Sequence, residues 1–263
     1  MSFNGRKNTT MCHVEVIRTE RISPNFMRIT VGGDNLAPLT KHGFDHWFRL
    51  FLPHEQGETN FNLPKRVDTL GYVQYLRMPA ETRPPMRNYT VRHHRPEALE
   101  LDIDFVVHGD EGLATRWATR ARPGDSVALL DQGAGFEFDP AVKHFLLAAD
   151  ETGLPAVAGI LRDLPRDARG SAVIEIPHAE DAQEVSAPEG VRVDWLVRDE
   201  GDRPGIRALE AVKKWERPEG RVTAYLVGEQ GLATGARRWL VNELGVPKKS
   251  IVFSGYWKIG VSH

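Results

Sequence analysis

Residues 99–107 read Leu-Glu-Leu-Asp-Ile-Asp-Phe-Val-Val, with apolar side chains at each odd position and acidic side chains at 100, 102 and 104. Alternation with a period of two predicts a β-strand that buries one face and leaves the other in water, as in an antiparallel sheet or barrel. Further strands are predicted at residues 14–16, 27–31, 46–52 and 126–130. The polar stretch 54–71 is interrupted by proline and predicts a long loop. We therefore expect an antiparallel β-barrel in the first half of the chain.

The second half alternates strands with helices. Near-continuous apolar runs predict buried strands at residues 144–149, 172–176, 191–197, 222–227 and 250–254. Helices are predicted between them at 154–164, 206–215 and 232–244. This order indicates a doubly wound α/β domain with a parallel sheet. We place the boundary near Asp139, which gives domains of residues 1–139 and 140–263.

Composition excludes several classes of protein. The 263 residues carry 34 Lys and Arg against 36 Asp and Glu, so no general basic field is available to hold nucleic acid. The single cysteine, Cys12, excludes an internal disulfide and a cysteine-ligated iron–sulfur cluster. No apolar run approaches the ~18 residues of a membrane helix, and the polar start lacks the core of a signal peptide. We expect a cytoplasmic monomer with no membrane insertion and no nucleic-acid partner.

Four histidines, His42, His46, His93 and His94, raise the question of a metal site. No carboxylate or cysteine accompanies them at a spacing typical of metal ligands. The sequence therefore predicts solvated or packed imidazoles and no metal site.

A flavin site is suggested by the run Arg87-Asn-Tyr-Thr-Val-Arg92 at the start of a strand. FAD needs a cation for its pyrophosphate, a flat partner for its ring and a small hydrogen-bonding group near the ring edge. Arg87, Tyr89 and Thr90 supply these three groups in one short segment. The alternative is an ordinary strand with a surface arginine and a packed tyrosine.

A second candidate segment follows the strand that ends at Val107. Glycines allow the backbone to approach a ligand closely, and a helix is predicted from Leu113 onward, so its free N–H groups suit a pyrophosphate. An ordinary glycine-containing loop is the alternative.

The second half lacks a Gly-x-Gly-x-x-Gly fingerprint, yet two strand-to-helix turns lie where nucleotides bind in such domains. The first is Asp150-Glu-Thr, directly after a predicted strand, and the second is Gly228-Glu. Plain connecting turns are the alternative.

Five segments in order resemble those of the siderophore-interacting proteins, a family of FAD-containing, NAD(P)H-dependent ferric-siderophore reductases in the ferredoxin-reductase-like superfamily. The segments are Arg87-x-Tyr-Thr, His108-Gly-x-x-Gly-x-Ala-x-x-Trp-Ala, Asp150-Glu-Thr-x-Leu-Pro-Ala, Gly228-Glu and Ser254-Gly-Tyr-Trp-Lys. The resemblance spans roughly the whole chain. The chain departs from the family at Leu113, where proline is usual, and at Ala149, where glycine is usual.

The resemblance implies an FAD-binding barrel followed by an NAD(P)H-binding α/β domain. By the resemblance, Arg87, Tyr89 and Thr90 contact the flavin, and the flavin-binding residues of the second segment and its neighbourhood are Asp104, Val107, His108, Gly112, Ala114 and Thr115. The residues that would border the nicotinamide nucleotide are Asp150, Glu151, Thr152, Gly228 and Glu229. Electrons would pass from NADPH or NADH through FAD to the Fe(III) of a ferric siderophore, whose hard oxygen donors hold Fe(II) less well. No catalytic nucleophile is then needed. The alternatives are a general flavin or ferredoxin-type reductase on the same fold, and a siderophore-binding carrier without flavin.

Cations are needed for the charged ligands. Arg49 and Lys258 are our candidates for an anionic ferric siderophore, because the net charge of −2 gives the protein no global attraction. Arg198 and Arg203 follow a predicted strand and could hold the 2′-phosphate that distinguishes NADPH from NADH.

Overall fold

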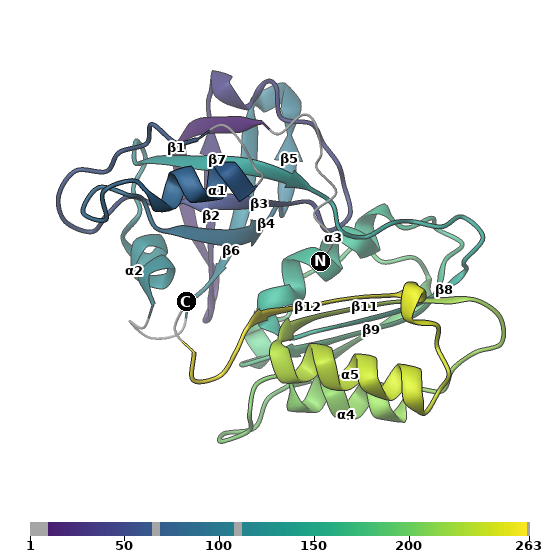
Figure 1. Ribbon diagram of the computed structural model, residues 1–263. Coiled ribbons are helices and arrows are strands. Elements are labelled where there is room, and N and C mark those ends of the chain that lie inside the picture. Colours follow the sequence, from purple (N-terminus) through teal and green to yellow (C-terminus); the bar gives the residue numbers. More distant parts are fainter. Residues whose placement is uncertain (1–9, 65–68, 108–111, 262–263) are drawn as a thin grey trace. The chain divides into compact units, whose positions relative to one another are not determined.

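The computed structural model describes residues 10–64, 69–107 and 112–261 (Figure 1). By its internal contacts the chain divides into two units. The barrel unit holds residues 1–22, 27–42 and 46–134, and the α/β unit holds 23–26, 43–45 and 135–263. The main division therefore falls between Ala134 and Gly135, against residue 139 predicted from the sequence. The two units are described separately.

The barrel unit is built on one seven-stranded sheet with the order β4-β3-β7-β1-β2-β6-β5. Its strands are β1 (Met11–Ser23), β2 (Phe26–Gly32), β3 (Trp47–Phe51), β4 (Met86–Thr90), β5 (His93–Arg95), β6 (Glu100–Val106) and β7 (Ser126–Gly133). Pairing is antiparallel between β1 and β7, between β3 and both β4 and β7, and between β5 and β6. The predicted antiparallel architecture is confirmed.

The two ends of this sheet meet through the short connection between β4 and β5. The Val91 N–H donates to the His46 carbonyl at 2.8 Å, just before β3, and the Arg92 N–H donates to the Asp102 carbonyl of β6 at 2.9 Å. The first hydrogen bond continues the pairing of β4 with β3 and the second continues the pairing of β5 with β6, so the continuous segment 86–95 connects the two edges of the sheet. Alternate residues of β6 (Leu101, Ile103 and Phe105) are fully buried in the barrel core.

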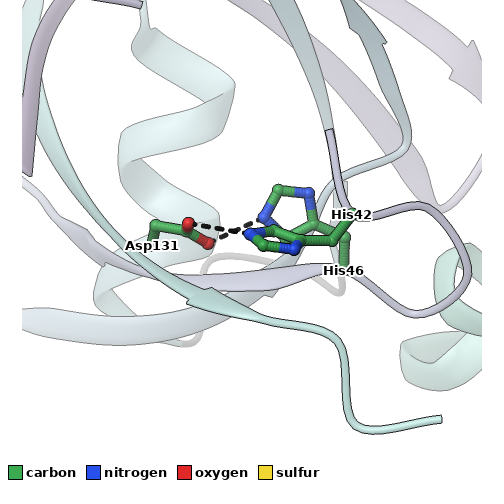
Figure 2. A group of neighbouring side chains, drawn as sticks. All are labelled: His42, His46 and Asp131. Atoms are coloured by element: carbon green, nitrogen blue, oxygen red, sulfur yellow. Dashed lines mark hydrogen bonds and ion pairs between the residues drawn. The ribbon is translucent and has the colours of Figure 1, made fainter. Parts of the chain in front are cut away.

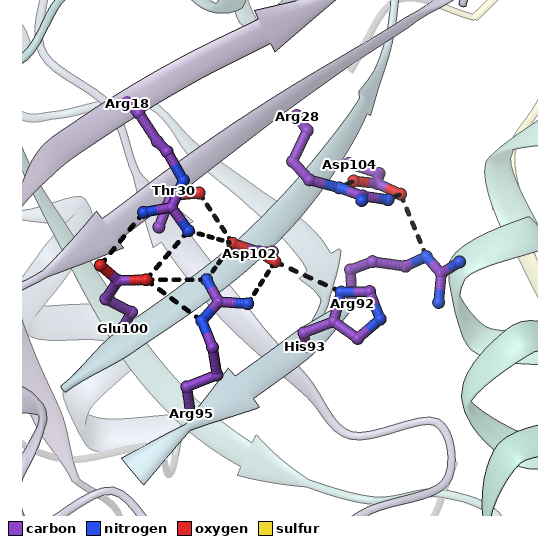
Figure 3. A network of polar contacts seen from close by, with 9 residues as sticks. All are labelled: Arg18, Arg28, Thr30, Arg92, His93, Arg95, Glu100, Asp102 and Asp104. Atoms are coloured by element: carbon purple, nitrogen blue, oxygen red, sulfur yellow. Dashed lines mark hydrogen bonds and ion pairs between the residues drawn. The ribbon is translucent and has the colours of Figure 1, made fainter. Parts of the chain in front are cut away.

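The other face of β6 differs from the prediction. The acidic residues were expected to face water, but Asp102 and Asp104 are each only 4% exposed. Arginines from neighbouring strands cover them (Figure 3), because the long aliphatic stem of arginine packs over apolar surface while its guanidinium reaches a carboxylate. Arg95 makes two hydrogen bonds of 2.6 Å to Asp102, and the Thr30 hydroxyl donates to the same carboxylate at 2.7 Å.

These contacts shift the ionisation of Asp102. Burial alone would raise its pKa, but hydrogen bonds from Arg95, His93 and Thr30 outweigh it and hold the pKa well below its usual range. The carboxylate is therefore part of the folded structure as an anion.

The barrel unit also contains helices α1 (Thr69–Leu76) and α2 (Leu113–Arg120) and the single 3-10 turns Asp34–Leu36 and Pro96–Ala98. Helix α1 begins inside the stretch 54–71 that was predicted as loop, and its Tyr75 packs edge-on against Phe51 with ring centroids 5.7 Å apart. Four of its apolar side chains, Leu70, Tyr72, Val73 and Leu76, are exposed, which is why no helical periodicity is visible in the sequence.

The α/β unit has a five-stranded parallel sheet with the order β10-β9-β8-β11-β12. Its strands are β8 (His144–Ala149), β9 (Arg169–Ile176), β10 (Gly190–Val197), β11 (Val222–Glu229) and β12 (Ile251–Trp257). Its helices are α3 (Leu154–Asp163), α4 (Ile206–Lys214) and α5 (Gln230–Asn242), with 3-10 turns at Glu151–Gly153, Ala179–Asp181 and Lys248–Ser250. The predicted doubly wound domain is confirmed, although the edge strand β10 is only half buried.

The strand order locates a ligand site in this unit. Helix α3 covers one face of the sheet and helices α4 and α5 cover the other (Figure 1). The chain moves outward from β8 to β9 and β10 on one side, and to β11 and β12 on the other. The order therefore reverses between β8 and β11, and ligands of doubly wound sheets bind beyond the carboxyl ends of the two strands at such a point. No helix in the described part of the chain is long and apolar enough to cross a membrane.

Replacing Asp102 with asparagine should lower the free energy of unfolding by about 2–3 kcal/mol at neutral pH, because charged hydrogen bonds are lost. The matched change Glu100→Gln, on the same strand with a side chain 21% exposed, should cost less than about 1 kcal/mol. Because the folded pKa of Asp102 lies below its unfolded value, the deficit is full above about pH 4 and shrinks as the pH falls below it. Equal deficits in denaturant unfolding of the two variants would contradict this account.

Candidate functional site

The predicted flavin residues of β4 lie on a strand anchored in the barrel core. Thr90 is buried, and Tyr89 is half-buried against Phe105 of β6 with ring centroids 4.3 Å apart. Phe105 in turn packs against Trp117 of α2 at 5.4 Å. This row of rings ties β4, β6 and α2 together. The structure therefore brings the two predicted flavin segments to one region of the barrel unit.

Helix α2 begins at a glycine. Its N-cap residue is Gly112, with φ of 93° and no side chain to cap the helix, and among the described residues no side chain accepts a hydrogen bond from the N–H groups of its first turn, which holds no acidic residue. Ala114 and Thr115 lie in that turn, and the Thr115 hydroxyl donates to the Val106 carbonyl at 3.4 Å. A helix start of this kind leaves backbone N–H groups for an anion. Val107 is buried just before it, and His108 lies outside the described residues.

The donor set fits a flavin nucleotide. Arg87 supplies a cation, Tyr89 a ring, and the uncapped start of α2 supplies N–H donors. The indole Nε1 of Trp117 is buried without a hydrogen-bond partner among the described residues. Such donors are seldom left unpaired in a folded protein, so the region has capacity for a polar ligand.

Asp104 of the predicted flavin set is paired within the barrel unit. Its side chain is fully buried and accepts hydrogen bonds from Arg28 at 2.7 and 2.8 Å. The Arg92 Nε lies 3.2 Å from the same carboxylate (Figure 3). Asp104 therefore orients Arg28 and Arg92, and its part in flavin binding stays a prediction.

The predicted nucleotide residues gather at the point where the sheet order reverses. Asp150 follows β8 and is fully buried. One carboxylate oxygen accepts from the Thr152 N–H at 2.9 Å and the Thr152 hydroxyl at 2.6 Å. The other accepts from the Glu229 N–H at 2.6 Å and the Trp257 indole at 3.0 Å. Asp150 thus links the ends of β8, β11 and β12.

Burial and the nearby Glu151 charge raise the pKa of Asp150 to about 6. Because this value exceeds the unfolded one, ionising Asp150 costs stability as the pH rises from about 4 to about 6.

Carboxylates of the chain itself occupy the helix starts of this unit. The Glu229 side chain accepts from the Gly231 and Leu232 N–H groups and so caps α5. Glu175 of β9 accepts from the Gly205, Arg207 and Ala208 N–H groups, at 2.7, 2.9 and 3.1 Å, and caps α4. Asp150 caps the turn that leads into α3. These described helix starts are therefore closed to a pyrophosphate, which agrees with the missing glycine fingerprint.

Glu175 was missed from the sequence. It is the single charged residue of the apolar run 172–176, and a charge inside a buried strand is a signal that a buried partner exists.

The predicted 2′-phosphate cations separate in the structure. The Arg198 side chain is 11% exposed and pairs with Glu151 and, at 3.0 Å, with Glu175. Both partners are buried carboxylates of the α/β unit, so Arg198 already has counter-charges within the protein, and its role toward a 2′-phosphate stays a prediction. Arg203 is exposed.

The predicted siderophore cations differ in their surroundings. Arg49 of β3 is half-buried, and burial lowers its pKa. No carboxylate of the described residues pairs with it, although holding a cation there without a counter-charge is unfavourable. Lys258 is exposed, directly after β12.

Comparison with known proteins gives matches along nearly the whole chain. A family model described as a siderophore-interacting FAD-binding domain matches residues 15–135, and one described as a siderophore-interacting protein matches residues 142–260. The ferric vibriobactin reductase of Vibrio cholerae is 30% identical over 94% of this chain and 89% of its own. The NADPH-dependent ferric-chelate reductase of Escherichia coli is 32% identical over 96% and 94%.

Solved structures agree with these matches. A siderophore utilization protein from T. fusca is 35% identical with a TM-score of 0.79, covering 97% of this chain and 95% of that one. A ferredoxin reductase in carbazole 1,9a-dioxygenase, 15% identical with a TM-score of 0.63, shares the fold over 95% of this chain and 70% of that one.

The contact between Asp150 and Gly228 can be tested by substitution. Gly228→Ala should destabilise the protein, because φ is +117° and a Cβ would lie 2.6 Å from the Asp150 carboxyl carbon. Gly220→Ala is the matched control, with φ of +89° and no atom within 4 Å of the added Cβ. The Gly228 variant should lose about 1–3 kcal/mol more than the control in denaturant unfolding. Equal losses would show that the Asp150 carboxyl group can move away.

Proposed function

The chain belongs to the family of siderophore-interacting proteins, and we propose that it is an NAD(P)H-dependent oxidoreductase that reduces the Fe(III) of ferric siderophores through FAD. The observation that carries this proposal is the uncapped start of α2 beside the aromatic row from Tyr89 to Trp117. The reductase names of the relatives and the FAD-binding family model support the same assignment.

FAD, when bound, supplies the chemistry of taking an electron pair from a nicotinamide nucleotide and giving electrons singly to Fe(III). The chain's own residues bind and orient it. We assign Arg87 and the N–H groups of α2, at Gly112, Ala114 and Thr115, to the pyrophosphate. Tyr89 offers its ring face, and Thr90 a hydroxyl at the ring edge. Asp104, Val107 and His108 complete the set proposed from the sequence.

The nucleotide is proposed to bind at the carboxyl ends of β8 and β11, bordered by Thr152 and Gly228. This edge is held in place by the side chains of Asp150, Glu151 and Glu229, because their carboxylates are already bonded within the protein. Arg203 is the exposed candidate cation for a 2′-phosphate. Together with the name of the E. coli relative, it favours NADPH over NADH.

The acceptor is proposed to be an anionic ferric siderophore, and the candidate cations for it are Arg49 in the barrel unit and Lys258 in the α/β unit. We further propose that the protein is a monomer of the cytoplasm, where reduced nicotinamide nucleotides are supplied. A general flavin or ferredoxin-type reductase would prefer free flavin or a protein acceptor. A carrier would bind the ferric siderophore without flavin.

The purified protein should be yellow and release FAD, not FMN, on denaturation. With NADPH and a ferric siderophore it should deliver Fe(II) to a ferrous chelator. Arg87→Ala should weaken FAD binding by about 1.5–3 kcal/mol, because a charged hydrogen bond to the pyrophosphate is lost. Arg77→Ala removes an exposed arginine of the same unit and should leave FAD affinity unchanged.

Each alternative predicts a different result. A colourless protein that cannot be reconstituted with FAD but binds ferric siderophore would indicate the carrier. A yellow protein that reduces free flavin faster than ferric chelates would indicate the general reductase. Equal FAD affinity in the Arg87 and Arg77 variants would remove Arg87 from the site.

Replacing Arg49 and Lys258 together with alanine should weaken binding of an anionic ferric siderophore while FAD content and reduction by NADPH stay unchanged. Binding to the parent should fall with added salt, and the slope should be shallower in the double variant. The matched control is Lys248→Ala with Lys249→Ala, which removes two exposed cations of the same charge. If both double variants have the same affinity and salt slope, the acceptor site lies elsewhere.

A further inference from the structure

Two imidazoles converge on one carboxylate at the edge of the barrel unit (Figure 2). His42 lies in the loop before β3, His46 directly precedes β3, and Asp131 lies on β7, the strand that pairs with β3. The His42 Nε2 is 3.2 Å from Asp131 Oδ2, and the His46 Nε2 is 2.8 Å from Asp131 Oδ1. These ligand atoms all lie within 4.8 Å of one another.

We propose that His42, His46 and Asp131 form a binding site for a divalent first-row transition-metal ion. The inference is independent of the proposed reductase activity. At the tetrahedral angle, metal–ligand bonds of 2.0–2.2 Å place neighbouring ligand atoms about 3.3–3.6 Å apart. The two nitrogen–oxygen distances, 3.2 and 2.8 Å, are shorter than this by about 0.1–0.8 Å, so a small separation of the side chains admits an ion. Two imidazoles and one carboxylate are borderline donors that suit Zn²⁺ and Fe²⁺ and are too few in oxygen for Ca²⁺.

The backbone holds two of the three side chains in place. The register of β3 against β7 shifts between Trp47 and Phe48, so that Phe48 is opposite Asp131 while Trp47 is opposite Gly133. Irregular pairing of this kind turns side chains toward a site. Asp131 Oδ1 also accepts from the Gly133 N–H at 2.8 Å. The His46 side chain is 2% exposed and the Asp131 side chain 6%, so neither can swing away into water.

The third ligand provides access. The His42 side chain is 31% exposed, so an ion can enter from solvent and keep water in its remaining positions. The Asp131 carboxylate supplies the negative charge that a buried cation requires.

The test is equilibrium dialysis of the flavin-loaded protein, without a histidine tag, against Zn²⁺. The parent should retain one zinc ion per chain. His42→Ala should weaken zinc binding at least about tenfold, because a ligand is lost from a side chain too exposed to be needed for folding. His13→Ala is the matched control, since it removes an exposed histidine of the same unit and should bind like the parent.

Thermal unfolding provides a second readout. An ion that binds only the folded state raises the melting temperature by mass action. Zn²⁺ should therefore raise the melting temperature of the parent and of His13→Ala, and should have little effect on His42→Ala. Absence of a stoichiometric zinc ion in the parent would overturn the proposal. Equal zinc affinity, or an equal rise in melting temperature, in the His42 and His13 variants would overturn it as well.

Discussion

A carboxylate can be buried in a protein only if hydrogen-bond donors surround it, and this requirement determines the local geometry of both units. In the barrel unit Asp102 and Asp104 pair with arginines of β1, β2 and β5 and of the connection between β4 and β5, and these arginines cover one face of β6. In the α/β unit Asp150 joins the ends of three strands, and Glu175 holds the start of α4. Hydrogen bonds and ion pairs to these buried carboxylates therefore fix the positions of the polar residues nearest the proposed ligands.

Helix starts are used in opposite ways in the two units. In the α/β unit the chain's own carboxylates take the free N–H groups of α4 and α5 and of the turn before α3. In the barrel unit no side chain of the described residues caps the start of α2 at Gly112. Backbone donors that are fixed in advance favour tight retention of an anionic group. The contrast suits a resident cofactor in the barrel unit and an exchangeable nucleotide in the α/β unit.

Sequence patterns predicted the architecture because they report burial along a single segment. The run 144–149 became β8 to the residue, since a strand covered on both faces is apolar throughout. The acidic face of β6 was predicted to face water, because the arginines that cover it come from other segments of the chain and leave no trace in the pattern of this strand. Helix α1 was missed because its apolar side chains are exposed. Asp131 lies far from His42 and His46 in sequence, so only the folded sheet brings the three together.

The close approach of Gly228 to Asp150 also constrains how this protein can evolve. A side chain at 228 would enter the space of the Asp150 carboxylate, and loss of that carboxylate would leave the Glu229 N–H and the Trp257 indole without an acceptor. Single changes at either position are therefore harmful. We therefore expect positions 150 and 228 to change together among homologous chains, or not to change at all. The residues of two separate turns would then evolve as a coupled pair.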